Sequence, residues 1–168
     1  ARPKMVANDT MNIWIDIAKP VLTELISKVD TLLINEEEAK QLTGEDHLPD
    51  AANAITAMGP SSTVIKRGEY GVTLFGDNFS FAAPAYPIER VVDPTGAGDS
   101  FAGGFMGYLA SVDKVDEESL RTAAIVGSTM ASFAVEDFGL DRIKYLTYSD
   151  IAERFEAFVD LTRFNPLT

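Results

Sequence analysis

The sequence contains no cysteine and only one histidine. It therefore forms no disulfide and offers no thiolate metal site. The lone His47 lies in the polar segment EDHLPD, and we interpret it as a surface residue. No run of about 18 apolar residues is present, and the first residues lack the apolar core of a secretory signal. These absences give no sign of a membrane partner, and we expect a cytoplasmic protein.

Basic residues are also scarce, with 14 Lys and Arg against 26 Asp and Glu, so the net charge is −12. A charge of this sign opposes non-specific binding to a polyanion, and we expect no nucleic-acid partner. A small anion remains a candidate ligand, because converging backbone N–H groups bind phosphate even in an acidic protein.

What the sequence does contain is an alternation of short apolar runs with segments of helical spacing, joined by short connections. This order predicts an α/β protein built on a layered sheet. The strands are expected at 4–9, 32–34, 63–66, 72–75 and 79–82, the last two as a hairpin. The helices are expected at 20–29, 36–44, 51–58, 98–110, 117–135 and 149–161.

Polar residues gather where the expected strands end, at residues 9–12, 35–38, 66–71 and 93–99. In an open α/β sheet, ligands bind outside the carboxyl ends of the strands. Each group also has a structural interpretation. Asp9 and Asn12 could cap a turn, EEEAK could be a solvated helix start, and Lys66 could be a surface lysine at a strand end.

The segment DPTGAGDS, at residues 93–100, combines a glycine turn with the start of a helix. Gly96 and Gly98 let the backbone turn closely, so that the N–H groups of residues 96–99 could converge on an oxyanion. Asp99 in the same turn is either a base for a hydroxyl group or an acidic residue that simply favours a helix start. Farther along this helix, Gly103, Gly104 and Gly107 are unfavourable in a helix interior, and we expect close backbone packing against the sheet to compensate.

Three motifs in order resemble the signatures of the ribokinase-like (PfkB) family of carbohydrate and nucleoside kinases. They are NEEE at 35–38, KRGEYG at 66–71 and VVDPTGAGDSFAGGF at 91–105. The resemblance implies a ribokinase-like three-layer α/β/α sandwich with a mostly parallel sheet. It also implies transfer of a phosphoryl group from ATP, with Mg²⁺, to a hydroxyl of a nucleoside, adenosine-like by preference, or of a sugar.

The same resemblance implies roles for individual residues. Asp99 matches the catalytic base. The anion hole that receives the transferred phosphoryl group is matched by Gly96, Ala97 and Gly98. Asn35 and Glu38 match the family residues that bind the nucleotide phosphates and Mg²⁺. Lys66, Gly68 and Gly71 match the family's nucleotide-binding turn.

A monovalent-cation site is matched by Asp93 and Thr95, completed by the carbonyls of Ala134 and Gly139. Ile143 departs from the ribokinase pattern, in which a small polar ligand is expected, so the resemblance leaves a K⁺ requirement open.

Family members are about twice as long as this chain, so the resemblance covers residues 1–168 as the C-terminal, nucleotide-binding part of one domain. The N-terminal half of the family fold, with the lid over the acceptor, is expected as a partner of this chain. A homodimer is a second expected partnership. The alternative function is a non-catalytic nucleotide-binding half that needs a partner segment for activity. A Rossmann dehydrogenase is disfavoured, because no G-x-G-x-x-G follows the first strand.

Overall fold

The computed structural model describes residues 3–165 and 167. The chain divides into two compact units. The first comprises the chain up to Ala82 together with Val115–Glu117, and the second comprises Ala83–Lys114 and Glu118–Thr168. The assignment of residues 1–168 to a single domain remains a prediction.

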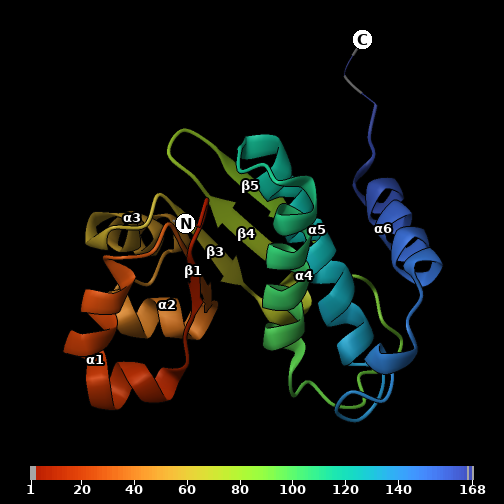
Figure 1. Cartoon of the computed structure of the whole chain (residues 1–168), viewed down its shortest axis with the longest axis horizontal. Coiled ribbons are helices and arrows are strands. Elements are labelled where there is room, and N and C mark those ends of the chain that lie inside the picture. Colours follow the sequence, from red (N-terminus) through yellow and green to blue (C-terminus); the bar gives the residue numbers. More distant parts are fainter. Residues whose placement is uncertain (1–2, 166, 168) are drawn as a thin grey trace. The chain divides into compact units, whose positions relative to one another are not determined.

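A 5-stranded sheet forms the centre of the first unit, in the order β1-β2-β3-β4-β5 (Figure 1). Its strands are β1 (Ala7–Asp9), β2 (Thr31–Asn35), β3 (Ser62–Lys66), β4 (Val72–Phe75) and β5 (Ser80–Ala83), the last of which ends at the unit boundary. β1, β2 and β3 are parallel, and β4 is antiparallel to β3. The predicted hairpin joins β4 to β5, where the Gly76 N–H donates to the Phe79 carbonyl at 2.9 Å. The predicted α/β class with a mostly parallel sheet is therefore confirmed.

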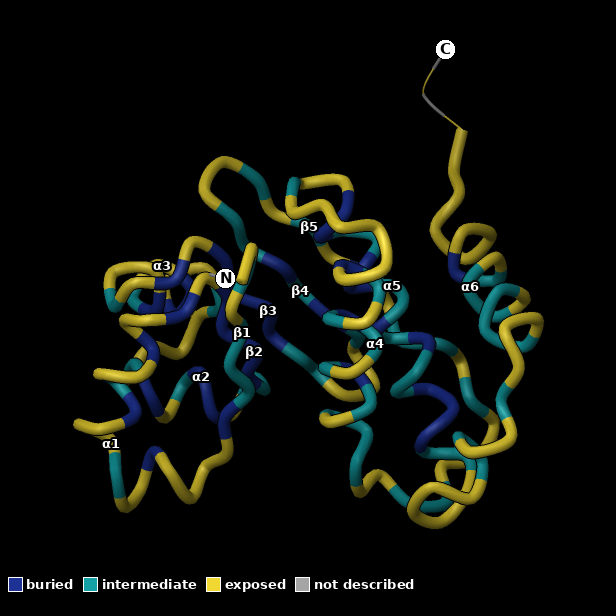
Figure 2. The backbone as a smooth tube through the Cα atoms, viewed as in Figure 1, coloured by how far each residue is buried: buried dark blue, intermediate teal, exposed yellow. Residues whose placement is uncertain are grey.

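One face of this sheet is covered by α1 (Asn12–Ile26), α2 (Glu36–Thr43) and α3 (Leu48–Met58), which Figure 1 shows on the same side. Ile26 of α1 and Ile55 of α3 share one buried apolar cluster with Leu32, Ile34 and Ile65 from the strands. The other residues of β2 and β3 are buried as well, except for the half-buried last residue of each strand, as the dark-blue strands of Figure 2 show. Burial on both faces explains the consecutive apolar residues at the centre of these strands, Leu32–Ile34 in β2 and Val64–Ile65 in β3.

Two predictions at the start of the chain were wrong in their bounds. The strand expected at 4–9 is only Ala7–Asp9 and is half-buried. Just before it, the Val6 N–H donates to the Asp30 carboxylate at 2.7 Å, while the Val6 carbonyl accepts from the Thr31 N–H at 3.2 Å. The helix expected at 20–29 begins at Asn12 and is kinked at Ala18, where φ is −140°. Pro20 lies just after the kink, at the start of the second helical segment, where a residue without an N–H is tolerated.

The second unit contains α4 (Ala97–Val112), α5 (Glu117–Ala134) apart from its first residue, the short 3₁₀ turn η2 (Ile143–Tyr145) and α6 (Tyr148–Thr162). These bounds confirm the helices predicted for this part of the chain to within a few residues. Within the described residues, no helix combines the length and the apolar character needed to cross a membrane.

Candidate active site

Four of the polar residues singled out in the sequence lie together at the carboxyl ends of β1, β2 and β3. We call Asp9, Asn35, Glu38 and Lys66 the strand-end cluster. Asp9 ends β1, Asn35 ends β2 and Lys66 ends β3, with Asn35 and Lys66 opposite each other in the parallel ladder. Because parallel strands end at the same edge of a sheet, the fold itself brings these side chains together.

Asn35 and Glu38 form a reciprocal capping box at the start of α2. The Asn35 side-chain oxygen accepts a hydrogen bond from the Glu38 N–H at 2.8 Å, and Glu38 Oε2 accepts one from the Asn35 N–H at 3.1 Å. This pairing satisfies two N–H groups that a helix start otherwise leaves without partners. The NEEE motif therefore has a complete structural role, and the box also holds the Glu38 carboxylate toward the edge of the sheet.

Lys66 is held by Asp9 in a two-pronged ion pair. The ammonium donates to both carboxylate oxygens of Asp9, at 2.6 and 2.8 Å. The side chains are only 16% and 25% exposed, so the pair is shielded from much of the solvent. Lys66 was predicted as a nucleotide-binding residue, whereas its partnership with Asp9 was missed. The signal was an acidic residue and a basic residue ending strands of one parallel sheet.

Glu38 is 7% exposed, the most buried carboxylate of the strand-end cluster. Burial raises its pKa above the ordinary value of a glutamate, because desolvation disfavours the charged form. The N–H of Asn35 and the Lys66 ammonium act against that rise, while the negative charge of Asp9 adds to it. The carboxylate is thus held in a site where a cation would be favourable.

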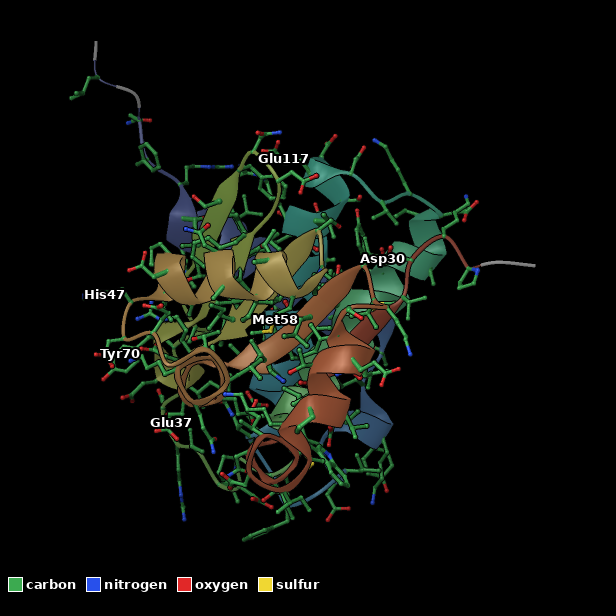
Figure 3. All side chains as sticks on the ribbon, turned by 90° about the vertical axis from the view of Figure 1, so that its left-hand side faces the viewer. Asp30, Glu37, His47, Met58, Tyr70 and Glu117 are labelled. Carbon is green, nitrogen blue, oxygen red and sulfur yellow. The ribbon has the colours of Figure 1, made fainter. Side chains whose placement is uncertain are left out.

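The turn after β3 depends on two glycines in left-handed backbone conformations. Gly68 has φ of +56° and Gly71 has φ of +89°, a region that other residues occupy at a cost. The Arg67 N–H closes the turn by donating to the Gly71 carbonyl at 2.8 Å, and the Arg67 guanidinium pairs with Glu36 at 2.8 Å. Tyr70 is exposed at the tip of this turn and labelled in Figure 3, which shows that Glu37 of α2 also points outward.

The second candidate group lies entirely within the second unit. We call residues Asp93–Asp99 the glycine turn. Asp93 Oδ1 accepts a hydrogen bond from the Thr95 N–H at 2.9 Å, and this bond holds the pKa of Asp93 below its usual value, with a smaller contribution from the Gly139 N–H. The Val135 carbonyl accepts from the N–H of Val92 at 2.8 Å, which ties the approach to the turn to the end of α5.

Gly96 is the N-cap of α4, with φ of +80° and no side chain capping the helix. The Ala97 N–H donates to the Pro94 carbonyl at 3.2 Å, whereas the N–H groups of Gly98 and Asp99 have no acceptor among the described residues. Asp99 lies in the same first turn, with an exposed side chain. Unpaired N–H groups at a helix start favour an anion, and here they lie beside a carboxylate.

The glycines of α4 do not all pack as expected. A Cβ at Gly104 would lie 3.0 Å from the Val126 carbonyl oxygen and 3.1 Å from Cα of Gly127, so this glycine lets α4 and α5 approach closely. A Cβ at Gly103 or Gly107 would meet nothing within 4 Å. The predicted packing against the sheet is therefore wrong. Gly104 does pack closely, but against α5, and Gly103 and Gly107 have no close neighbour.

A charged cluster that sequence reasoning missed holds the segment after α5. Glu136 pairs with Arg154 at 2.7 Å and with Arg142 at 3.2 Å, while the Arg154 guanidinium lies 3.5 Å from the centre of the Phe133 ring. The cluster fixes the chain on both sides of Gly139, whose N–H faces Asp93. Ile143, where the expected cation ligand is lacking, lies in η2.

Comparison with solved structures defines the class of fold. The crystal structure of the Methanocaldococcus jannaschii nucleoside kinase, described as an archaeal member of the ribokinase family, superimposes with a TM-score of 0.72 at 25% identity. The match covers 91% of this chain and 48% of that chain. The ribokinase-like fold predicted from the motifs is thus confirmed.

Sequence comparison assigns the family. The profile of the pfkB family of carbohydrate kinases matches residues 4–144, and the chain belongs to that family. A cytidine kinase of Thermococcus kodakarensis is 44% identical over 93 residues, which are 54% of this chain and 33% of that protein. A ribokinase of Staphylococcus aureus is 31% identical over 127 residues, which are 73% of this chain and 40% of that protein. The chain spans less than half the length of these relatives.

Proposed function

We propose that this chain is the nucleotide-binding and catalytic part of a kinase that transfers the terminal phosphoryl group of ATP to a hydroxyl of a nucleoside or sugar. One observation carries the proposal. The first turn of α4 presents two N–H groups with no acceptor among the described residues, and the carboxylate of Asp99 belongs to that same turn. Phosphoryl transfer to a hydroxyl needs this combination, an anion site beside a proton acceptor.

In this proposal the glycine turn has two tasks. The N–H groups of Gly98 and Asp99 stabilise the negative charge on the transferring phosphoryl group, and Gly96 supplies the left-handed conformation that exposes them. Ala97 contributes to the shape of this anion hole, since its own N–H is bonded to Pro94. The Asp99 carboxylate accepts the proton of the attacking hydroxyl, which is also why a negative group stands beside an anion site.

The strand-end cluster is assigned to the phosphates and the metal. Mg²⁺ is commonly held by one or two carboxylates together with water and substrate phosphates, and a buried Glu38 beside Asp9 fits that donor set. When bound, Mg²⁺ would neutralise phosphate charge. Among the described residues no group of three or more His, Cys, Asp or Glu is placed to hold a metal. Asn35 orients Glu38, Lys66 supplies a positive charge for phosphate, and Gly68 and Gly71 shape the turn that receives the nucleotide.

The proposal extends to the class of acceptor and to a monovalent-cation site. A nucleoside is favoured, with adenosine-like compounds first, and relatives named as cytidine kinase and nucleoside kinase support the nucleoside class. Asp93 and Thr95 are assigned to a monovalent-cation site, completed by the carbonyls of Ala134 and Gly139. The second candidate function, a nucleotide-binding half without turnover of its own, is favoured by the coverage of less than half of each relative.

The test is ADP release with Mg-ATP over a panel of nucleosides and sugars, with ATP binding measured alongside. Asp99→Asn should lower acceptor-dependent turnover by about 10²- to 10⁴-fold while ATP binding survives. Asp50→Asn is the matched control, because Asp50 is an exposed aspartate in the first turn of α3. Equal turnover in the wild-type and Asp99→Asn proteins would refute the assigned base. ATP binding without turnover for any acceptor would favour the nucleotide-binding half.

A further inference from the structure

The helix α6 contributes an arginine whose charge is held inside the second unit. The Arg154 side chain is only 14% exposed, and its guanidinium pairs with the Glu136 carboxylate at 2.7 Å. The same guanidinium donates to the Ser132 hydroxyl at 3.1 Å and lies 3.5 Å from the centre of the Phe133 ring. Charged side chains are rarely this enclosed unless they are paired, so these contacts define where Arg154 lies in the folded protein.

The partners of Arg154 lie where α5 ends. The Glu136 N–H closes the last turn by donating to the Phe133 carbonyl at 3.2 Å. Arg142 also pairs with Glu136, at 3.2 Å, so that two guanidinium groups hold one carboxylate. Val135 therefore lies between a ring that is stacked on Arg154 and a carboxylate that is paired with it.

The carbonyl of Val135 ties the glycine turn to this end of α5. It accepts hydrogen bonds from the N–H of Val92 at 2.8 Å and from the N–H of Asp93 at 3.4 Å. Asp93 is the first residue of the glycine turn, and Pro94 after it restricts the backbone φ. One carbonyl therefore sets the direction in which the chain enters the turn, and its position depends on the contacts at the end of α5.

We propose that Arg154 is a positioning residue for the glycine turn. It acts through the end of α5, whose Val135 carbonyl holds the backbone that enters the turn. α6 lies beyond residues 4–144, the part of the chain that the pfkB profile matches, so Arg154 is not among the motifs from which the site was assigned. The catalytic consequence rests on the proposed function, because the glycine turn carries both the anion hole and Asp99.

The nature of the contact favours positioning over stability alone. A partly buried ion pair is weak evidence for stability, because desolvation of both charges offsets much of their attraction. What the pair provides is direction, since a guanidinium that binds a carboxylate and stacks on a ring has a fixed orientation. The pair of Arg163 with Asp160 at the end of α6 is open by comparison, with its atoms 3.8 Å apart and its side chains 72% and 77% exposed. Arg163 is therefore the matched control.

Amide hydrogen exchange followed by NMR measures the positioning on the chain itself, without turnover. In Arg154→Gln we expect the protection factors of the Val92 and Asp93 amides to fall about tenfold, the effect of losing a charged hydrogen bond. The amides of β2, which pairs with a strand on each side, report global unfolding and should change by less than about threefold. Arg163→Gln should leave both sets of amides unchanged.

Two further variants test the route through Glu136. Glu136→Gln should lower the protection of Val92 about as much as Arg154→Gln does, and the double variant should lower it no further, because members of one network are not additive. Arg154→Lys keeps the charge but not the planar stacking group, so it should restore only part of the protection. If Arg154→Gln fails to fold, Arg154→Lys decides, through the protection of Val92 relative to that of β2.

The assay of ADP release measures the consequence for phosphoryl transfer. Arg154→Gln should lower kcat about tenfold and change the KM for ATP by less than about twofold, because the turn acts on the phosphoryl group in transfer. Arg163→Gln should leave both constants at their wild-type values.

Three results would overturn the proposal. The first is unchanged protection of Val92 and Asp93 in Arg154→Gln. The second is an equal loss of protection at these amides and in β2, which would assign Arg154 to stability alone. The third is a wild-type kcat in Arg154→Gln. Absence of turnover in the wild type would count against the proposed kinase activity instead, because hydrogen exchange needs no substrate and still decides the role of Arg154.

Discussion

The strand-end cluster and the glycine turn satisfy their polar groups in opposite ways. In the strand-end cluster, side chains bind one another or nearby backbone, as in the Lys66–Asp9 ion pair and the Asn35–Glu38 capping box. In the glycine turn, Asp93 binds the Thr95 N–H, but the start of α4 is uncapped and Asp99 is exposed.

The difference separates polar groups that already have protein partners, and so add to the stability of the fold, from polar groups that have no partner in the free protein. A polar group that already has a partner contributes to folding, and removing the partner leaves a charge or an N–H unsatisfied. A group with no partner in the free protein contributes little to folding and keeps its binding capacity. Substitutions in the two groups should therefore act on different measurements.

The largest expected effect comes from breaking the ion pair. Asp9→Asn leaves the Lys66 ammonium partly buried without a carboxylate, and we expect it to lower the free energy of unfolding by about 1–3 kcal/mol. Asp99→Asn should change it by less than about 1 kcal/mol, since only a favourable interaction with the helix dipole is lost.

Urea denaturation of both variants, followed by circular dichroism, measures this contrast. The control is the double variant Asp9→Asn/Lys66→Met, because it also removes the charge that Asp9→Asn alone leaves unpaired. Equal destabilisation by Asp9→Asn and Asp99→Asn would contradict the distinction between the two groups.

A smaller effect is expected within α4, which positions the glycine turn. Gly104→Ala places a methyl group against backbone atoms of α5 and should cost about 1–2 kcal/mol as the two helices separate. Gly103→Ala enters open space and should stabilise the protein by roughly 0.5–1 kcal/mol, because alanine favours the helix. Melting temperatures of the two variants give the answer, and a shift of the same sign in both would show that the close approach of α4 and α5 is unimportant.

The local signals that the sequence carries clearly are those made by neighbouring residues. The helix expected at 36–44 was found at Glu36–Thr43, with Asn35 as its N-cap and Gly44 as its C-cap. The short apolar runs of β2 and β3 were equally clear, because a strand buried on both faces favours consecutive apolar residues.

What the sequence concealed depends on contacts between distant residues. Asp9 and Lys66 are 57 positions apart, and only the parallel order of the strands brings them together. The same holds for Gly104 and Gly127, whose close approach explains why Gly104 is needed whereas Gly103 and Gly107 are not. The start of α1 was missed because Pro20 suggested a beginning, whereas the helix continues through a kink at Ala18.

The smallest effect compares two glutamates in the first turn of α2. The pKa of Glu38 is raised by burial, so the folded protein retains a proton that the unfolded chain has lost. Stability contributed by this group therefore falls as pH rises from the ordinary value of 4.5 through the raised pKa. Lys40 and then Arg67 lower the pKa of Glu36, so its contribution is present above 4.5 and is lost as pH falls through the lowered pKa.

Glu38→Gln and Glu36→Gln should consequently give opposite pH profiles of the free energy of unfolding, each within about 1 kcal/mol of the wild type. As pH rises from acid to neutral, the free energy of unfolding of Glu38→Gln should increase relative to that of the wild type. The substitution removes the buried charge, while the amide oxygen still accepts a hydrogen bond from the Asn35 N–H. The free energy of unfolding of Glu36→Gln should decrease relative to that of the wild type over the same range, because Lys40 and Arg67 lose their carboxylate partner. Denaturation series from pH 3 to pH 8 measure both slopes, and parallel profiles would show that burial does not govern the charge of Glu38.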